Sequence, residues 1–171
     1  SESYNFFLVV LFPHNQMQIL DYNRIIKDLN GLSEDEFVSA LKEKFEVRLV
    51  TSNIEAKPAK EREFGLYING NWYCLTANAQ LLTEIDENDP VKNLDVSIMQ
   101  EFILTPLLNI RDQRTDKRID FVGGIRGLAE LEKRVESGDW KAAITLFATS
   151  IESLMAIADA GGIMPPKSTW F

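Results

Sequence analysis

The sequence predicts one α+β domain in which helices pack on a mixed, largely antiparallel β-sheet. Three observations support this fold class. Short apolar or alternating runs recur along the 171 residues and predict about seven strands. Some of these runs follow one another across tight turns, as the strands of antiparallel hairpins do. Other stretches place their apolar residues at helical spacing and predict about four helices.

Composition and charge restrict what the domain can be. Hydrophobic residues make up 45% of the chain and charged residues 26%, as in ordinary globular proteins. The net charge of −8 argues against nucleic acid as a partner, because phosphate backbones require a clustered basic surface. The only cysteine, Cys74, excludes an intramolecular disulfide, and the only histidine, His14, excludes a multi-histidine metal site. We therefore expect a cytoplasmic domain with no membrane partner.

The chain opens with a predicted hairpin. Residues Asn5 to Phe12 form a continuous apolar run, which favours a strand buried on both faces. Pro13 to Gln16 predicts a turn, and Met17 to Leu20 predicts the returning strand. A short helical turn is then predicted from Ile25, Ile26 and Leu29.

The next elements carry clear local signals. Ser33 is the expected N-cap of a helix over residues 33–44, and Glu36 would complete its capping box. Residues 45–50 alternate between apolar and polar side chains and predict a strand. Residues 54–63 are polar and predict a surface loop or a short helical linker.

The dipeptide Asn69–Gly70 predicts a hairpin that joins strands over residues 64–68 and 72–77. Cys74 is interpreted as a small residue of the second strand. Residues 78–90 are acidic but lack the alternating oxygen ligands of a calcium loop, so they predict a solvated loop. Asp95 is then the expected N-cap of a helix that ends before Pro106, and residues 111–118 predict a charged loop.

A glycine-rich turn follows the strand predicted over Ile119 to Val122. It reads Gly123-Gly124-Ile125-Arg126-Gly127 and precedes a helix marked by Leu128, Leu131 and Val135. In this arrangement, free N–H groups at the helix N-terminus can hold an anion. The stretch matches neither a Walker loop nor a dinucleotide fingerprint. The alternative is a tight turn that needs glycine only for its backbone conformation.

The chain closes on a strand, a helix and a stiff arm. Residues 140–148 predict the strand, Thr149 or Ser150 the cap of the helix, and Gly161–Gly162 its end. Two prolines then hold Met164 to Phe171 extended. Lys167, Ser168 and Thr169 follow these prolines and could bind an anion, whereas the two aromatic residues behind them favour packing on a neighbour.

The closing sequence Met-Pro-Pro-Lys-Ser-Thr-Trp-Phe resembles the C-terminal signature of the bacterial domain-of-unknown-function family 1015. Residues 6–20, 95–118 and 119–124 are similar to further stretches of that family. The resemblance implies that the chain is the C-terminal part of a longer protein, with an upstream domain as its partner. In the family that domain carries an Asp-Gly-His-His-Arg motif, which this chain lacks.

That motif is similar to the phosphate-handling motif of the ParB and sulfiredoxin superfamily, to which free-serine kinases belong. The resemblance therefore implies a nucleotide or phosphorylated small molecule as ligand, with ATP or ADP and magnesium in the full-length protein. At the position where the family suggests His-Arg, this chain has Asn23-Arg24. This departure weakens a proton-transfer role there, but Arg24 can still contact an anion.

Two hypotheses follow. In the first, the chain belongs to a phosphate- or nucleotide-dependent small-molecule enzyme, and Asp120 holds a metal together with substrate phosphates. The alternative for Asp120 is a strand-end residue that satisfies backbone donors. In the second, the chain is a non-catalytic module that supports the upstream domain or forms a homodimer. No catalytic residue is assigned, and the anion-binding candidates are Lys167, Ser168, Thr169, Arg126, Gly123, Gly124 and Arg24.

Overall fold

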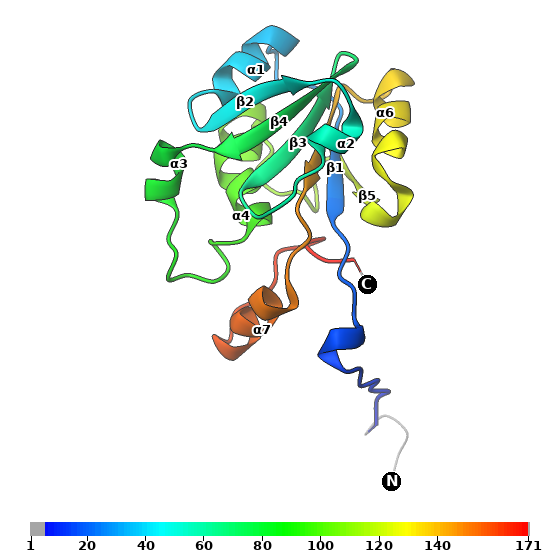
Figure 1. Cartoon of the computed structure of the whole chain (residues 1–171), viewed down its shortest axis with the longest axis vertical. Coiled ribbons are helices and arrows are strands. Elements are labelled where there is room, and N and C mark those ends of the chain that lie inside the picture. Colours follow the sequence, from blue (N-terminus) through cyan, green and yellow to red (C-terminus); the bar gives the residue numbers. More distant parts are fainter. Residues whose placement is uncertain (1–5, 171) are drawn as a thin grey trace.

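The computed structural model describes residues 6–170 and contains one six-stranded sheet (Figure 1). Its strand order is β2-β4-β3-β6-β1-β5, and every pair of neighbouring strands is antiparallel. The α+β class with a largely antiparallel sheet is thus confirmed. The strands are β1 (Tyr22–Ile26), β2 (Phe45–Val50), β3 (Glu63–Ile68), β4 (Asn71–Ala77), β5 (Ile119–Gly123) and β6 (Ala142–Leu146).

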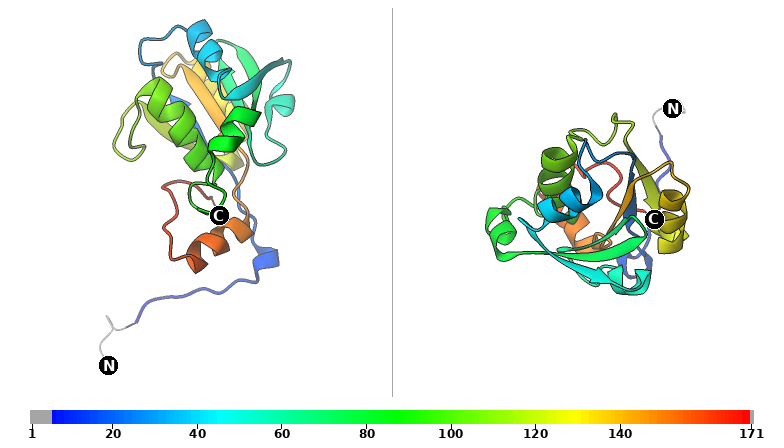
Figure 2. Two further views of the ribbon diagram at one scale, coloured as in Figure 1. Left: turned by 90° about the vertical axis from the view of Figure 1, so that its left-hand side faces the viewer. Right: turned by 90° about the horizontal axis from the view of Figure 1, so that it is seen from above.

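Helices cover both faces of the sheet (Figure 2). The larger core lies between one face and α1, α3, α4 and α5, whereas α2 and α6 cover the other face. The α-helices are α1 (Glu34–Leu41), α2 (Asn53–Ala56), α3 (Ala79–Glu84), α4 (Asp95–Met99), α5 (Thr105–Leu108), α6 (Leu128–Glu136) and α7 (Ile151–Asp159). A π-helix, η3 (Gln100–Leu104), joins α4 to α5, and two 3₁₀ turns are η2 (His14–Gln16) and η4 (Gly124–Arg126).

The first predicted hairpin is wrong. Residues 6–12 form no strand, and their seven large apolar side chains are 59–89% exposed. Asn5 lies outside the described residues. Of the predicted returning strand, only Leu20 pairs, in an isolated bridge with Trp170. A strand that is apolar on both faces needs cover on both faces, and the described body supplies none to this segment.

The helical turn predicted after the hairpin is also wrong, because residues 22–26 form the strand β1. Ile25 and Ile26 lie next to each other and enter the cores on opposite faces of the sheet. Two adjacent apolar residues fit a buried strand as well as a helix, so their spacing alone could not distinguish the two.

Two other local signals are confirmed, whereas the expected N-cap Asp95 is the first residue of α4, after the N-cap Leu94. The Ser33 hydroxyl accepts the Glu36 N–H at 3.2 Å, and the Glu36 carboxylate accepts the Ser33 N–H at 2.8 Å. This capping box starts α1 where the sequence predicts it, although the helix ends earlier, at Leu41. Asn69 and Gly70 have φ values of 50° and 73°, as the predicted hairpin turn requires.

Two predictions in the middle of the chain need correction. The expected acidic loop over residues 78–90 contains α3, which Asn78 caps. The expected end before Pro106 is absent, because the helical path continues into α5 with this proline in its first turn. A proline is tolerated there because the first N–H groups of a helix need no intrahelical acceptor.

The packing of α6 predicts an alkaline transition. The Tyr67 hydroxyl donates to Glu136 at 2.8 Å, and burial together with this bond raises its pKa to about 12. Because the folded state holds the phenolic proton more tightly, this contribution to stability is complete below about pH 10 and is lost as the pH rises through 12. We expect Tyr67→Phe to lose less stability than the wild type between these pH values in urea titrations. Tyr73→Phe is the control, and identical pH profiles for all three proteins would contradict the assignment.

Candidate functional site

Most of the predicted site residues lie at one end of the sheet, where β1 begins and β5 and β6 end. The antiparallel ladder places Tyr22 opposite Gly123 and Arg24 opposite Phe121. The C-terminal arm, residues 163–170, returns to the same end (Figure 1). The tertiary structure thus gathers residues that are far apart in the sequence.

The arm is anchored by its tryptophan. Backbone N–H groups of Leu20 and Trp170 donate to each other's carbonyls at 2.8 and 3.2 Å. The Trp170 ring packs edge-on against Tyr22 at 5.2 Å, and a Cβ on Gly123 would lie 2.9 Å from the same ring. Gly123 has an ordinary φ of −61°, so it serves close packing here and not a backbone conformation that only glycine adopts.

The three polar residues of the arm have different environments. Lys167 has φ of 55°, and its ammonium lies 5.4 Å from the centre of the Tyr22 ring. Ser168 is buried, and its hydroxyl donates to the Pro165 carbonyl at 2.8 Å. Its own carbonyl accepts the Thr149 hydroxyl at 3.2 Å, whereas Thr169 is half-buried. Ser168 therefore closes the arm's turn, and Lys167 alone of the three is exposed.

Arg24 is fully buried beneath this end of the sheet. Its Nε donates to Gln113 Oε1 at 2.9 Å, and its Nη1 donates to the Tyr22 carbonyl. The guanidinium lies 4.9 Å from the centre of the Phe121 ring. Within residues 6–170, Nη2 has no hydrogen-bond partner. Burial lowers the pKa of Arg24 to about 9, so the surroundings only partly compensate the charge.

The glycine turn forms a 3₁₀ turn and then α6. The Gly124 N–H donates to the Asp21 carbonyl at 2.8 Å, so this predicted donor is already used. A Cβ on Gly124 would lie 2.6 Å from Asp21 Cγ. Gly127 has φ of 71° and precedes α6, and no side chain caps the helix. The Gly124 N–H is thus not open to an anion, whereas the N–H groups of the first turn of α6 have no side-chain cap.

The start of α6 opens onto a cavity of about 480 Å³. Its floor is formed by the end of β6, and α2 and the following residue supply the opposite wall. Lys57 is exposed and forms no ion pair among the described residues. The cavity is lined by Asp21, Asn53, Ile54, Lys57, Gly124, Gly127, Leu128, Ala129, Thr145 and Leu146.

Sequence reasoning misses two charged residues of this cavity. Asp21 follows a stretch that predicts a strand, and Lys57 lies in the residues that predict a linker. A charged residue beside a proline in a polar stretch carries no signal of a distant partner. The glycine turn is the only wall of the cavity that the sequence indicates.

Of the predicted site residues, only Gly124 lines this cavity, whereas the residues of the C-terminal arm, Arg24, Gly123, Arg126 and Asp120 do not. Arg126 is 60% exposed, and its guanidinium lies 4.0 Å from the Glu130 carboxylate. Asp120 accepts the Phe121 N–H at 2.8 Å and pairs with Ile25, which places it on the opposite face of the sheet from Arg24. Among the described residues, no group of three or more histidine, cysteine or acidic side chains could hold a metal ion.

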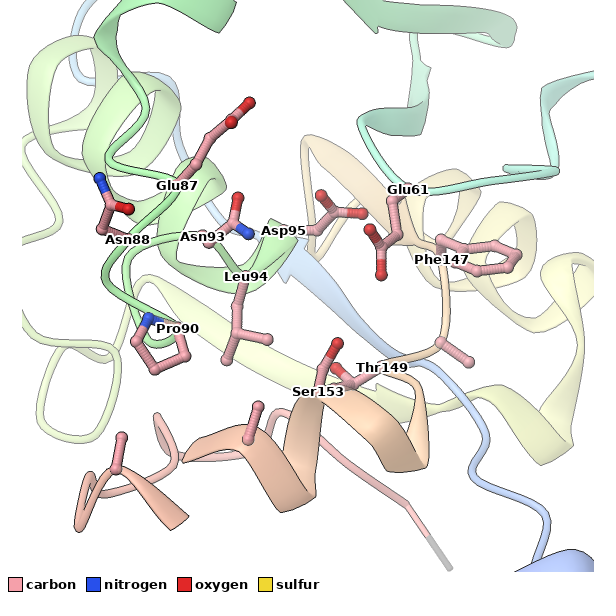
Figure 3. A pocket seen from close by; sticks show the side chains of 13 residues that line it. Glu61, Glu87, Asn88, Pro90, Asn93, Leu94, Asp95, Phe147, Thr149 and Ser153 are labelled. Atoms are coloured by element: carbon pink, nitrogen blue, oxygen red, sulfur yellow. The ribbon is translucent and has the colours of Figure 1, made fainter. Parts of the chain in front are cut away.

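A second cleft, of about 410 Å³, lies on the other side of the end of β6 (Figure 3). Four polar side chains point into it from different parts of the chain. They are Glu61 before β3, Asp95 in α4, Thr149 after β6 and Ser153 in α7. Burial raises the pKa of Asp95, while hydrogen bonds and an ion pair from Arg62 act in the opposite direction. The lining of the cleft therefore combines acidic side chains with the hydroxyl groups of Thr149 and Ser153.

A family model identifies the chain. Residues 1–97, more than half of the sequence, match the model described as "Protein of unknown function (DUF1015)". The chain belongs to this family. The match confirms the resemblance inferred from the closing sequence, although it covers the other end of the chain. No protein of curated function matches the DUF1015 chain.

Solved structures are similar to this DUF1015 chain. A mutant of a free serine kinase, in complex with AMP, matches with a TM-score of 0.50 and 15% identity over 90% of this chain. A conserved hypothetical protein from Pyrococcus furiosus matches with a TM-score of 0.47 and 17% identity over 89% of this chain. At such identities the likeness shows the fold alone.

The DUF1015 chain spans about half the length of these structures, covering 53% of the kinase and 54% of the Pyrococcus protein. Within the part of the chain that the structure describes, no helix is long and apolar enough to cross a bilayer.

Proposed function

We propose that this chain supplies a phosphate-binding site to a nucleotide-dependent small-molecule kinase. The observation that carries the proposal is the cavity in which the uncapped start of α6 and Lys57 face the same space. The positive end of the helix dipole and an ammonium group together favour an anion with several oxygen atoms. The cavity volume falls in the range of small-molecule and cofactor sites.

A nucleotide site also needs a carboxylate that can bind a metal ion, and Asp21 can provide it. Its carboxylate lies beside Gly124 and lines the cavity, whereas Asp120 does not line it. Magnesium is usually bound by one or two carboxylates together with substrate phosphates. Asp21 is therefore the residue that would hold such an ion, and it replaces Asp120 in this proposal.

The neighbouring cleft is suited to the acceptor. Leu146 lines the phosphate-binding cavity and Phe147 lines the acidic cleft, so the two sites meet across one strand end. Carboxylates and hydroxyls suit a polar acceptor that carries an amino group. The free serine kinase that shares the fold was solved with AMP, which supports a nucleotide and a serine-like acceptor.

Isothermal titration with AMP and ADP tests the proposed site. We expect Lys57→Ala to weaken nucleotide binding by about tenfold, because it removes one charge-assisted contact to phosphate. Lys60→Ala is the matched control, since Lys60 is exposed in the same segment but does not line the cavity. Equal affinities for the wild type and both variants, or no binding by the wild type, would contradict the proposal.

A specific observation also favours the alternative of a non-catalytic module. The apolar residues 6–12 are exposed in one continuous run, which is typical of a segment that packs on another folded body. This feature is independent of the cavity, so the two functions can be tested separately.

A further inference from the structure

Residues 6–12 form an exposed apolar segment that takes no part in the proposed phosphate-binding cavity. Its seven side chains expose on the order of 1,000 Å². Two segments of this size, buried reciprocally, exceed the roughly 1,600 Å² of a standard protein interface. The segment runs away from the body in Figure 1 and in the left view of Figure 2. Its backbone groups form no hydrogen bond with any residue in the range 6–170.

The sheet has one edge that can receive such a strand. β2 and β5 are the two edge strands. β2 carries the charged residues Glu46 and Arg48 among its exposed positions, and charges of this kind discourage pairing. β5 has a single charged residue, Asp120. Apart from the Phe121 N–H, which donates to Asp120, its outer backbone groups are therefore the less protected template.

The edge of β5 also offers apolar neighbours on both faces of the sheet. On one face, Phe121 is half-buried and packs edge-on against Tyr22 at 6.0 Å. On the other face, Val122 belongs to the second core. Ile125, in the turn after the strand, is 69% exposed. A strand that is apolar at every position needs such cover on both sides.

The segment of the same chain does not take this place, since residues 6–12 form no strand and pair with no strand of the described body. Trp170 pairs with Leu20 through two backbone hydrogen bonds, and its ring covers Gly123, the last residue of β5.

We propose that residues 6–12 add as a strand to the β5 edge of a second copy of this chain, and that the exchange is reciprocal. Each copy carries both the strand and the receiving edge, so the contact closes as a two-fold dimer. The sheet of each copy would thereby gain a seventh strand. The proposal does not depend on nucleotide binding.

Light scattering coupled to size exclusion, over a hundredfold range of concentration, tests the dimer. We expect a dimer for the wild type and a monomer for the double variant Leu8→Asp, Val10→Asp, with dimer dissociation at least about 100-fold more favourable. Leu49→Asp is the matched control, because Leu49 is 60% exposed on the other edge strand. The melting temperature of the monomeric variant reports whether the body remains folded.

Hydrogen exchange then locates the contact. In the dimer, the amides of residues 6–12 and of 119–123 should both be protected, and the double variant should lose protection at both. A monomer at every concentration overturns the proposal. In that case the segment would pair with the sheet of a different protein or domain. A dimer that survives the double substitution, or one that leaves the β5 amides unchanged, also overturns it.

Discussion

Replacing Gly65 by alanine is expected to destabilise the protein by about 3 kcal/mol, since overpacking a well-filled core costs up to this amount. A Cβ at this position would lie 2.5 Å from the Ala56 carbonyl oxygen and would overlap the Thr145 side chain. The backbone after α2 crosses β3 at this point, and a backbone carbonyl cannot rotate away as a flexible side chain can. For a chain of this length the melting temperature should fall by about 10 °C.

The same substitution should also weaken ligand binding. α2 and Lys57 form one wall of the phosphate-binding cavity, and Thr145 forms part of its floor. Displacing the crossing point moves these residues apart. Gly31→Ala is the control, because nothing lies within 4 Å of its Cβ and only its φ of 82° is unfavourable, at about 1 kcal/mol. If calorimetry finds that Gly65→Ala and Gly31→Ala lose equal stability, this account of Gly65 is refuted.

Replacing Gln113 by alanine is expected to cost about 3 kcal/mol, because it leaves a buried charge without its partner. Gln113 accepts from Arg24 and donates to Gln100 at 2.9 Å, and Gln100 in turn donates to the Ile110 carbonyl at 2.7 Å. This chain of hydrogen bonds links the π-helix to the end of the sheet. Among the described residues, Nη2 of Arg24 already lacks a hydrogen-bond partner. No further acceptor is therefore at hand to replace Gln113.

A second substitution separates the cost of the charge from the cost of lost packing. Arg24→Met removes the buried cation and keeps an apolar side chain of similar length. In the Gln113→Ala background it should recover at least about 1 kcal/mol, since an apolar residue tolerates a site without acceptors. Gln80→Ala, on the exposed surface of α3, should change stability by less than about 0.5 kcal/mol. Urea unfolding measures all four proteins, and a further loss in the double variant would show that packing dominates.

The elements that the sequence predicts well are those whose causes lie within a few residues. The Ser33–Glu36 capping box and the Asn69–Gly70 turn are examples, because their hydrogen bonds and dihedral angles involve only neighbours in the chain. The prediction for residues 6–12 fails for the opposite reason. Their apolar pattern indicates that the segment needs to be buried on both faces, whereas the described body leaves it exposed.

The candidate site divides in the same way. The glycine turn is visible in the sequence, because glycines that permit close approach or positive φ are a local requirement. Its chemistry is only partly predictable, since the Gly124 N–H is used by Asp21 and the open donors belong to α6. Lys57 and Asp21 acquire a common cavity only when α2 crosses the sheet.

The fold class, the family and the strand–turn–helix element that carries the helix N-terminus thus follow from the amino-acid sequence alone. Composition, periodicity and capping are properties of short stretches, so they can be evaluated without a structure. Which residues share a site depends instead on how the strands are ordered and packed. Contacts such as Trp170 with Gly123, or Arg24 with Gln113, join residues far apart in the chain. No local pattern records those long-range contacts, because they form only when the whole sheet assembles.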